Sequence, residues 1–156
     1  MYRYQILIEY EGSNFIGWQI QKKGNSVQKT IQNILSKLLK SKIKIIGAGR
    51  TDAGVHAIEQ SAHFDTKTNI TDKKKFLNSL NYFLNKKLIS INSIKKKNIN
   101  FHSRYSAKFR IYKYIIYNRE SNPSIFKNRG WHIKKKIDLK TLKKGAKLLE
   151  GKKDFS

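Results

Sequence analysis

The chain has 156 residues, enough for one ordinary core or for one domain and part of another. It carries 34 Lys and Arg against 10 Asp and Glu, and the formal net charge of +24 favours a polyanionic partner, usually nucleic acid, although AT-rich codon drift would also raise the lysine count. Cysteine is absent, which excludes disulfides and thiolate metal sites, and the four histidines lack ligand spacing, so we predict no metal site.

The N-terminal stretch MYRYQILIEY alternates between apolar and polar residues and does not form the long apolar run of a signal peptide. No other apolar run is long enough to cross a membrane. We therefore expect a soluble, cytoplasmic protein that makes no membrane contact.

Six elements are predicted before residue 98. Alternation of apolar residues indicates strands, and apolar residues at every third or fourth position indicate helices. In chain order the predictions are a strand over 2–10, a helix over 26–40 capped by Ser26, strands over 42–46 and 57–65, a helix over 71–84 capped by Thr71, and a strand over 87–94. This order is typical of a ferredoxin-like β-α-β-β-α-β sandwich, an α+β fold. We assign it to a domain over 1–98.

A second unit is expected over residues 99–156. Its elements are a strong strand over 106–120, a candidate short strand in GWHIKK, and a helix over 138–151 with Asp138 as N-cap and Gly151 beyond its end. So few elements cannot close a core of their own. We therefore expect the beginning of an α/β unit that is incomplete.

The stretch GAGRTDAGVHA, residues 47–57, joins two predicted neighbouring strands, and two to five residues would suffice for that connection. Its glycines permit unusual dihedral angles and close backbone approach, and long ordered loops on a rigid sheet often carry function. Arg50 and Asp52 are the candidate functional residues. In the alternative interpretation Asp52 caps a turn and pairs with Arg50, and His56 taken alone is more typical of a structural residue.

Tyrosines alternate with basic residues in the strand predicted over 106–120, and Tyr112 and Tyr114 share one face. Aromatic rings among cations suit stacking on an unpaired base while its phosphate is held. A tyrosine-rich strand in a core or interface is the alternative. The preceding FHSRYSA stretch brings Arg104 near this strand in sequence, and the KKK runs are most simply solvated faces.

The stretch AGRTDAGVHA, residues 48–57, closely resembles the signature of the tRNA pseudouridine synthase A (TruA) family. Other stretches match in the same order: IEYEGSNFIGWQIQ (8–21), SVQ (26–28), FHSRYSAKFRIYKYIIYN (101–118) and GKKDFS (151–156). The resemblance covers the whole chain, whereas the family proteins continue well beyond it.

The resemblance implies a pseudouridine synthase fold and isomerisation of uridine to pseudouridine on the 3′ side of the tRNA anticodon stem-loop, without cofactor or metal, by a homodimer. It implies that Asp52 is catalytic, that Arg50 fills the space left by the flipped nucleotide, and that Tyr112 stacks on the target base. Arg104 is expected near the tRNA backbone. Gly49, Thr51, Gly54 and His56 are expected to shape the loop.

The chemistry suits a carboxylate, which can act as a nucleophile, stabilise positive character at C1′ or take a proton. Attack on the base, attack on the sugar and a glycal route all stay open. The second half of the family fold normally supplies a basic partner for the aspartate and an apolar residue that packs the base, and residues 1–156 offer no substitute. The alternatives are therefore an inactive fragment, a non-catalytic RNA-binding module, or a basic scaffold of a ribonucleoprotein.

Overall fold

The computed structural model describes residues 1–154, so the last two residues of the GKKDFS stretch lie outside the described range. The chain divides into two compact units, Met1–Arg110 and Ile111–Ser156. Residues 99–110 pack with the first unit. The domain boundary expected at 98–99 stays a prediction. Within residues 1–154 no helix is long and apolar enough to span a membrane.

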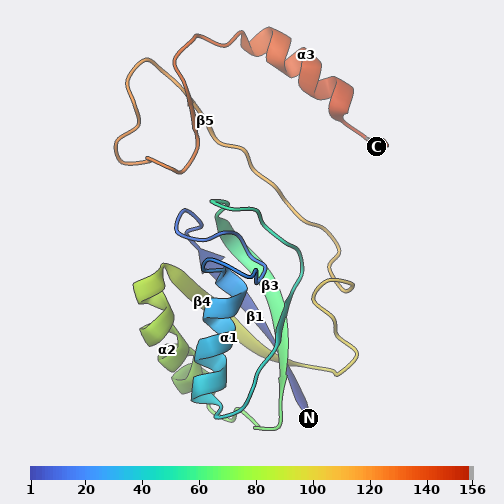
Figure 1. Ribbon diagram of the computed structural model, residues 1–156. Coiled ribbons are helices and arrows are strands. Elements are labelled where there is room, and N and C mark those ends of the chain that lie inside the picture. Colours follow the sequence, from blue (N-terminus) through green and yellow to red (C-terminus); the bar gives the residue numbers. More distant parts are fainter. Residues whose placement is uncertain (155–156) are drawn as a thin grey trace. The chain divides into compact units, whose positions relative to one another are not determined.

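The first unit combines one antiparallel sheet with two helices, as predicted (Figure 1). The sheet has the strand order β2-β3-β1-β4. Its strands are β1 (Tyr2–Tyr10), β2 (Ile45–Gly47), β3 (Ala57–Thr66) and β4 (Ile89–Lys97). The helices are α1 (Val27–Leu38) and α2 (Lys73–Leu84), and the short 3-10 turn η1 (Asn85–Lys87) follows α2. Both α1 and α2 cover the same face of the sheet (Figure 1).

The core lies between that face and the helices. Alternate residues of the central strand β1 point into it, because successive side chains of a strand project to opposite faces. The buried members include Tyr4, Ile6, Ile8 and Tyr10 from β1, Val27, Ile31 and Leu35 from α1, and Leu80 and Leu84 from α2. This packed layer fixes β2 and β3, which hold the two ends of the glycine-rich loop.

Ser26 is the N-cap of helix α1, as predicted, and its hydroxyl accepts the Lys29 N–H at 3.2 Å. The predicted cap of α2 was wrong by one residue. Asp72 rather than Thr71 is the N-cap, and its carboxylate accepts the Lys75 N–H at 2.9 Å. Both residue types cap helices well, so adjacent candidates cannot be separated by type alone.

Two strands of the first unit begin later than predicted. Strand β4 cannot start at residue 87, because Leu88 takes the left-handed conformation with φ 57° after η1. Strand β2 starts at Ile45, because the Ile43 N–H turns to the Ser36 hydroxyl of α1 at 2.9 Å instead of joining a ladder.

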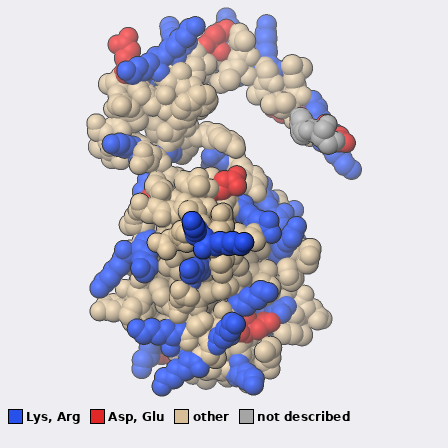
Figure 2. Space-filling view, in the orientation of Figure 1, with Lys and Arg blue, Asp and Glu red and all other residues tan. Residues whose placement is uncertain are grey.

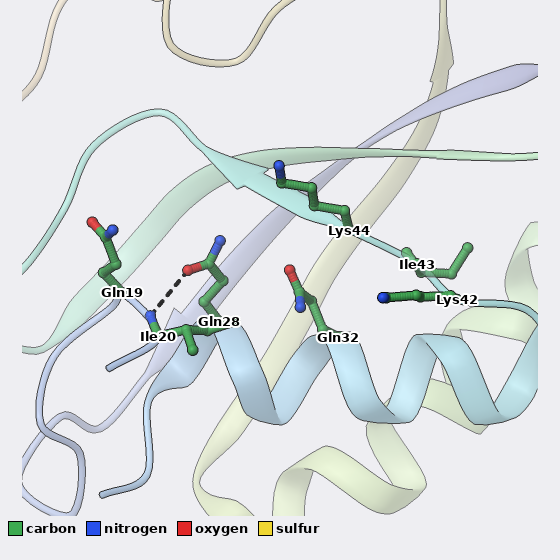
Figure 3. Close-up of a pocket in the computed structure, with 7 residues that line it drawn as sticks. All are labelled: Gln19, Ile20, Gln28, Gln32, Lys42, Ile43 and Lys44. Atoms are coloured by element: carbon green, nitrogen blue, oxygen red, sulfur yellow. Dashed lines mark hydrogen bonds between the residues drawn. The ribbon is translucent and has the colours of Figure 1, made fainter. Parts of the chain in front are cut away.

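The outer edge of β2 is hydrogen-bonded by side chains of α1, and Figure 3 shows Gln28 and Gln32 projecting from that helix. Gln32 Oε1 accepts the Ile45 N–H at 3.0 Å, and Gln28 Nε2 donates to the Ile45 carbonyl at 2.9 Å. Gln28 Oε1 also accepts the Ile20 N–H at 3.1 Å. An uncovered sheet edge presents such groups to other chains. Beside these hydrogen bonds lies a hollow of about 460 Å³, which is lined by Gln19, Ile20, Gln28, Gln32, Lys42, Ile43 and Lys44.

The second unit contains β5 (Ile116–Asn118) and β6 (Trp131–Ile133), which pair in parallel, and helix α3 (Leu139–Leu149). Asp138 caps α3, and Gly151 follows the helix with φ 101°, as predicted. The strand predicted over 106–120 was wrong over most of its length. Alternation reports the side-chain pattern, whereas a strand also needs a neighbour for its backbone groups, and among the described residues only β6 pairs with β5.

Large apolar side chains of the second unit are exposed. The buried core cluster of the described chain contains no residue beyond Ile94. Tyr114 is 94% exposed, Ile125 89% and Trp131 69%. The two short strands and single helix therefore enclose no core among the residues described, and the incompleteness of this unit stays a prediction.

Candidate functional site

The glycine-rich loop 47–57 is docked on a second loop, residues 11–25. The Trp18 N–H donates to the Thr51 carbonyl at 2.9 Å, and the Gly54 N–H donates to the Phe15 carbonyl at 3.3 Å. Phe15 and Trp18 are themselves buried in the core. The loop is thus anchored to the packed interior rather than suspended between its two strands.

Glycines let the two loops interlock. A Cβ on Gly12 would lie 2.0 Å from the Val55 carbonyl oxygen, and one on Gly17 would lie 2.5 Å from the Thr51 oxygen. Any larger residue at either position would push the loops apart. Within loop 47–57 itself, Gly54 has φ 79°, a conformation that disfavours residues with a Cβ.

Thr51 points inward, where its hydroxyl lies 2.8 Å from the hydroxyl of Tyr10 on β1. Tyr10 is only 3% exposed, and burial raises the pKa of its hydroxyl above the ordinary value. A buried phenol is costly unless its hydroxyl is hydrogen-bonded, so this pair fixes the middle of the loop against the sheet.

His56 closes the far end of the loop. Its Nδ1 accepts the Gly12 N–H at 3.0 Å, which uses the lone pair of that nitrogen. The Glu11 carboxylate lies 3.3 Å from the same nitrogen, a contact that is an ion pair only when the ring is protonated. These contacts join His56 to the loop 11–25, and its loop-shaping role stays a prediction.

Arg50 and Asp52 flank the inward-pointing Thr51, and both are exposed. The turn that follows is closed by the Asp52 carbonyl, which accepts the Val55 N–H at 3.3 Å. Among residues 1–154, no ion pair joins Arg50 to Asp52. The anchored loop thus exposes a carboxylate and a guanidinium to solvent. The alternative interpretation, in which Asp52 pairs with Arg50, does not hold for this pair of side chains.

The start of the loop is held by two residues that the sequence alone does not identify. Arg110 donates to the Ala48 carbonyl from Nη2 at 2.8 Å and from Nε at 3.3 Å. Gln60 of β3 donates to the Gly49 carbonyl at 2.6 Å. Gly49 itself has an ordinary φ, and a Cβ there would only touch the Arg110 side chain, at 3.6 Å.

The segment that carries Arg104 is strapped across the sheet. Arg3 of β1 pairs with Asp65 at 2.6 Å, and its Nη1 also donates to the Ile99 and Phe101 carbonyls at 2.6 and 2.7 Å. Arg104 itself is exposed, and its guanidinium lies over the Tyr105 ring at 5.8 Å. The structure thus places Arg104 in the same unit as the loop.

His63 lies beneath this strap and is 1% exposed. Its Nδ1 meets the Ser103 hydroxyl at 3.1 Å, while Nε2 is buried without a hydrogen-bond partner among the described residues. Burial lowers the pKa of His63 to about 4, and the nearby charges of Arg3 and His102 act in the same direction. The ring is therefore neutral at pH 7.

Tyr112 belongs to the second unit and is 67% exposed in an irregular segment before β5. The stacking of Tyr112 on the target base stays a prediction.

The residues that sequence reasoning missed are those that support the loop. The glycine spacing in EGSNFIGWQ was the available signal for the second loop, whereas Gln60 and Arg110 stand in patterns that resemble ordinary strands.

Comparison with known proteins bears directly on this loop. The sequence profile of the tRNA pseudouridine synthase family matches residues 6–106, which include both interlocked loops and Arg104. The tRNA pseudouridine synthase A of Pelagibacter ubique (strain HTCC1062) is 64% identical over 156 residues, which are 100% of this chain. The enzymes of the same name from Neorickettsia sennetsu and Ehrlichia chaffeensis are 42% and 44% identical over 98% and 99% of the chain.

The chain spans 63% of the length of each of these relatives. The profile match covers well over half of the chain, and it includes the loop that exposes Arg50 and Asp52. The chain belongs to the tRNA pseudouridine synthase family.

Proposed function

We propose that this chain carries the catalytic loop of a tRNA pseudouridine synthase that isomerises uridine to pseudouridine, with Asp52 as the catalytic residue. The observation that carries the proposal is the exposed Asp52 carboxylate on a loop anchored to the core at Thr51. Catalytic groups need fixed positions. A carboxylate beside phosphates weakens RNA binding by charge repulsion, so its presence on this loop favours a chemical role. The relatives' name supports tRNA as the substrate.

The reaction breaks the N1–C1′ bond of uridine and forms a C5–C1′ bond, while C5 loses a proton and N1 gains one. Asp52 is suited to attack the base or the sugar, or to take the proton from C5. The target base must first leave its stack. We propose that Arg50 occupies the vacated space, that Tyr112 stacks on the flipped base, and that Arg104 binds the tRNA backbone.

Charge supports a polyanionic substrate. The net charge is +24, and Lys and Arg side chains are spread over the visible face with few Asp and Glu among them (Figure 2). We propose the anticodon arm as the target region, the cytoplasm as the place of action and a homodimer as the assembly. The strand order β2-β3-β1-β4 supports a ferredoxin-like arrangement within the pseudouridine synthase fold.

The proposal is tested by separating binding from product formation. Asp52→Asn removes the carboxylate charge and keeps the shape, so we expect tRNA affinity close to that of the wild type and no pseudouridine. Glu59→Gln is the matched control, because it removes one charge from an exposed position on β3. Pseudouridine formed at the wild-type rate by Asp52→Asn would overturn the proposal.

A non-catalytic RNA-binding module is the second candidate. The exposed tyrosines of the second unit favour it, since Tyr112 and Tyr114 offer ring faces to unpaired bases. In that case the wild-type chain binds tRNA without forming product, and Asp52→Asn binds equally well or more tightly.

A further inference from the structure

One guanidinium joins two stretches of the first unit that are distant in sequence, the loop 47–57 and the segment that carries Arg104. Arg110 Nη2 donates to the Ala48 carbonyl at 2.8 Å and to the Arg104 carbonyl at 3.0 Å, and Nε donates to Ala48 at 3.3 Å. Ala48 belongs to the loop with Asp52, and Arg104 belongs to the strapped segment. The same side chain thus binds Ala48, which is 62 positions away in sequence, and Arg104, which is 6 positions away.

The contact falls where the loop leaves the sheet. The Ala48 N–H is already fixed by the Ser61 carbonyl at 2.7 Å, and Ala48 is 7% exposed. The next carbonyl, that of Gly49, is held by Gln60, and the Thr51 carbonyl is held by the Trp18 N–H. With the Arg110 contact, the carbonyls of Ala48, Gly49 and Thr51 are all hydrogen-bonded, and Thr51 directly precedes Asp52.

Arginine suits this contact better than lysine. Its planar guanidinium offers several N–H groups in a fixed fork, so it can reach two carbonyls at once without losing its geometry. The ammonium of lysine is a point charge on a flexible stem. An Arg110→Lys change therefore keeps the charge and loses the fork.

We propose that Arg110 is a positioning residue, which locks the start of the Asp52 loop to the segment that carries Arg104. It acts through the Ala48 and Arg104 carbonyls and not on the substrate. The catalytic consequence of this inference rests on the proposed function, whereas the structural part does not.

The structural part is tested by hydrogen exchange over residues 47–57, measured by mass spectrometry on the 156-residue chain. Loss of the fork in Arg110→Lys should speed exchange in this loop by about tenfold, the effect of losing roughly one net hydrogen bond. Arg119→Lys is the matched control, because Arg119 also donates to two carbonyls, those of Ser121 and Asn122, entirely within the second unit. It should leave the exchange of loop 47–57 unchanged.

The catalytic part is tested by single-turnover formation of pseudouridine in a tRNA transcript. Arg110→Lys should lower the rate constant by about 10- to 100-fold, because small misplacements of a catalytic group are costly, while the Kd for tRNA stays within about threefold because the charge is retained. A purely electrostatic role would instead leave both values unchanged in Arg110→Lys.

Wild-type exchange in Arg110→Lys, or a wild-type rate constant, would overturn the inference. If the wild-type chain forms no pseudouridine, the proposed function fails for this chain, and the exchange experiment still decides whether Arg110 holds the loop.

Discussion

The Tyr10 hydroxyl lies 2.8 Å from the Thr51 hydroxyl, so the central strand of the sheet is hydrogen-bonded to the residue between Arg50 and Asp52. The bond reaches from the buried side of β1 to the middle of the exposed loop. It links the core that the sequence pattern builds to the two side chains proposed to act on RNA.

Tyr10→Phe should release Thr51 and lower the free energy of unfolding by about 1 kcal/mol, the usual net contribution of one hydrogen bond. Urea unfolding followed by Trp18 fluorescence in a Trp131→Phe background measures this, since the chain has two tryptophans. Tyr2→Phe is the control, because Tyr2 also lies on β1 and its ring faces the Lys96 ammonium. Equal stability of Tyr10→Phe and Tyr2→Phe would contradict the assigned role of the bond.

Gly12→Ala should separate the two interlocked loops, because its Cβ would lie 2.0 Å from the Val55 carbonyl oxygen. We expect a loss of about 1 to 3 kcal/mol, typical of overpacking at a site that must shift. The same unfolding experiment measures it. Gly145→Ala in α3 is the control, since a Cβ there meets nothing within 4 Å, and it should leave the first unit at wild-type stability.

The stability of the first unit should fall in mild acid because of His63. Its pKa is about 4 when folded, against the ordinary value of 6.5, so the unfolded chain binds the proton more readily. The stabilisation is complete above pH 6.5 and is lost as the pH falls from 6.5 towards 4. From the linkage relation the loss is about 2 to 3 kcal/mol by pH 4.5.

Unfolding free energies of His63→Gln, measured between pH 7.5 and 4.5, should show a flatter pH dependence than those of the wild type. His132→Gln, which changes a histidine of the second unit, should keep the wild-type slope. Asp65 does not mimic the effect, because Arg3 lowers its pKa and its own stabilisation is lost only below its ordinary value of 3.8. A wild-type slope in His63→Gln would show that another group titrates.

Gln32→Ala should expose the Ile45 N–H at the outer edge of β2. We expect about 1 kcal/mol of destabilisation and a concentration-dependent rise in apparent mass in sedimentation experiments, since uncovered edges pair with other chains. Asn33→Ala is the control on the same helix, at an exposed position. If both variants sediment as the wild type does, the hydrogen bond of Gln32 does not protect the edge of β2.

Local patterns predicted much of the first unit. Alternation gave β1 at its observed bounds, and Ser26 gave the start of α1, because both depend on nearby residues. The interlocking of residues 11–25 with 47–57 was not predictable, because a glycine reveals that space is scarce and not which distant carbonyl fills it. The contacts of Gln60 and Arg110 with the loop were not predicted either, because the residue type does not reveal which distant carbonyl a side chain reaches.

The second unit marks the other limit. The alternation in YKYIIYN suits a strand, yet only Ile116–Asn118 pairs with a neighbour among the described residues. Tyr112 lies outside the paired residues and is exposed, because alternation alone does not supply a neighbour for the backbone groups of a strand.

The central claim is that Asp52 performs the isomerisation in the anticodon arm. The most direct measurement is carbodiimide-adduct primer extension on an unmodified tRNA transcript, after incubation with the wild-type chain, Asp52→Asn and Glu59→Gln. The account predicts stops on the 3′ side of the anticodon stem-loop for the wild type and Glu59→Gln, and none for Asp52→Asn. Stops of equal strength with Asp52→Asn, or no stops with any of the three, would contradict it.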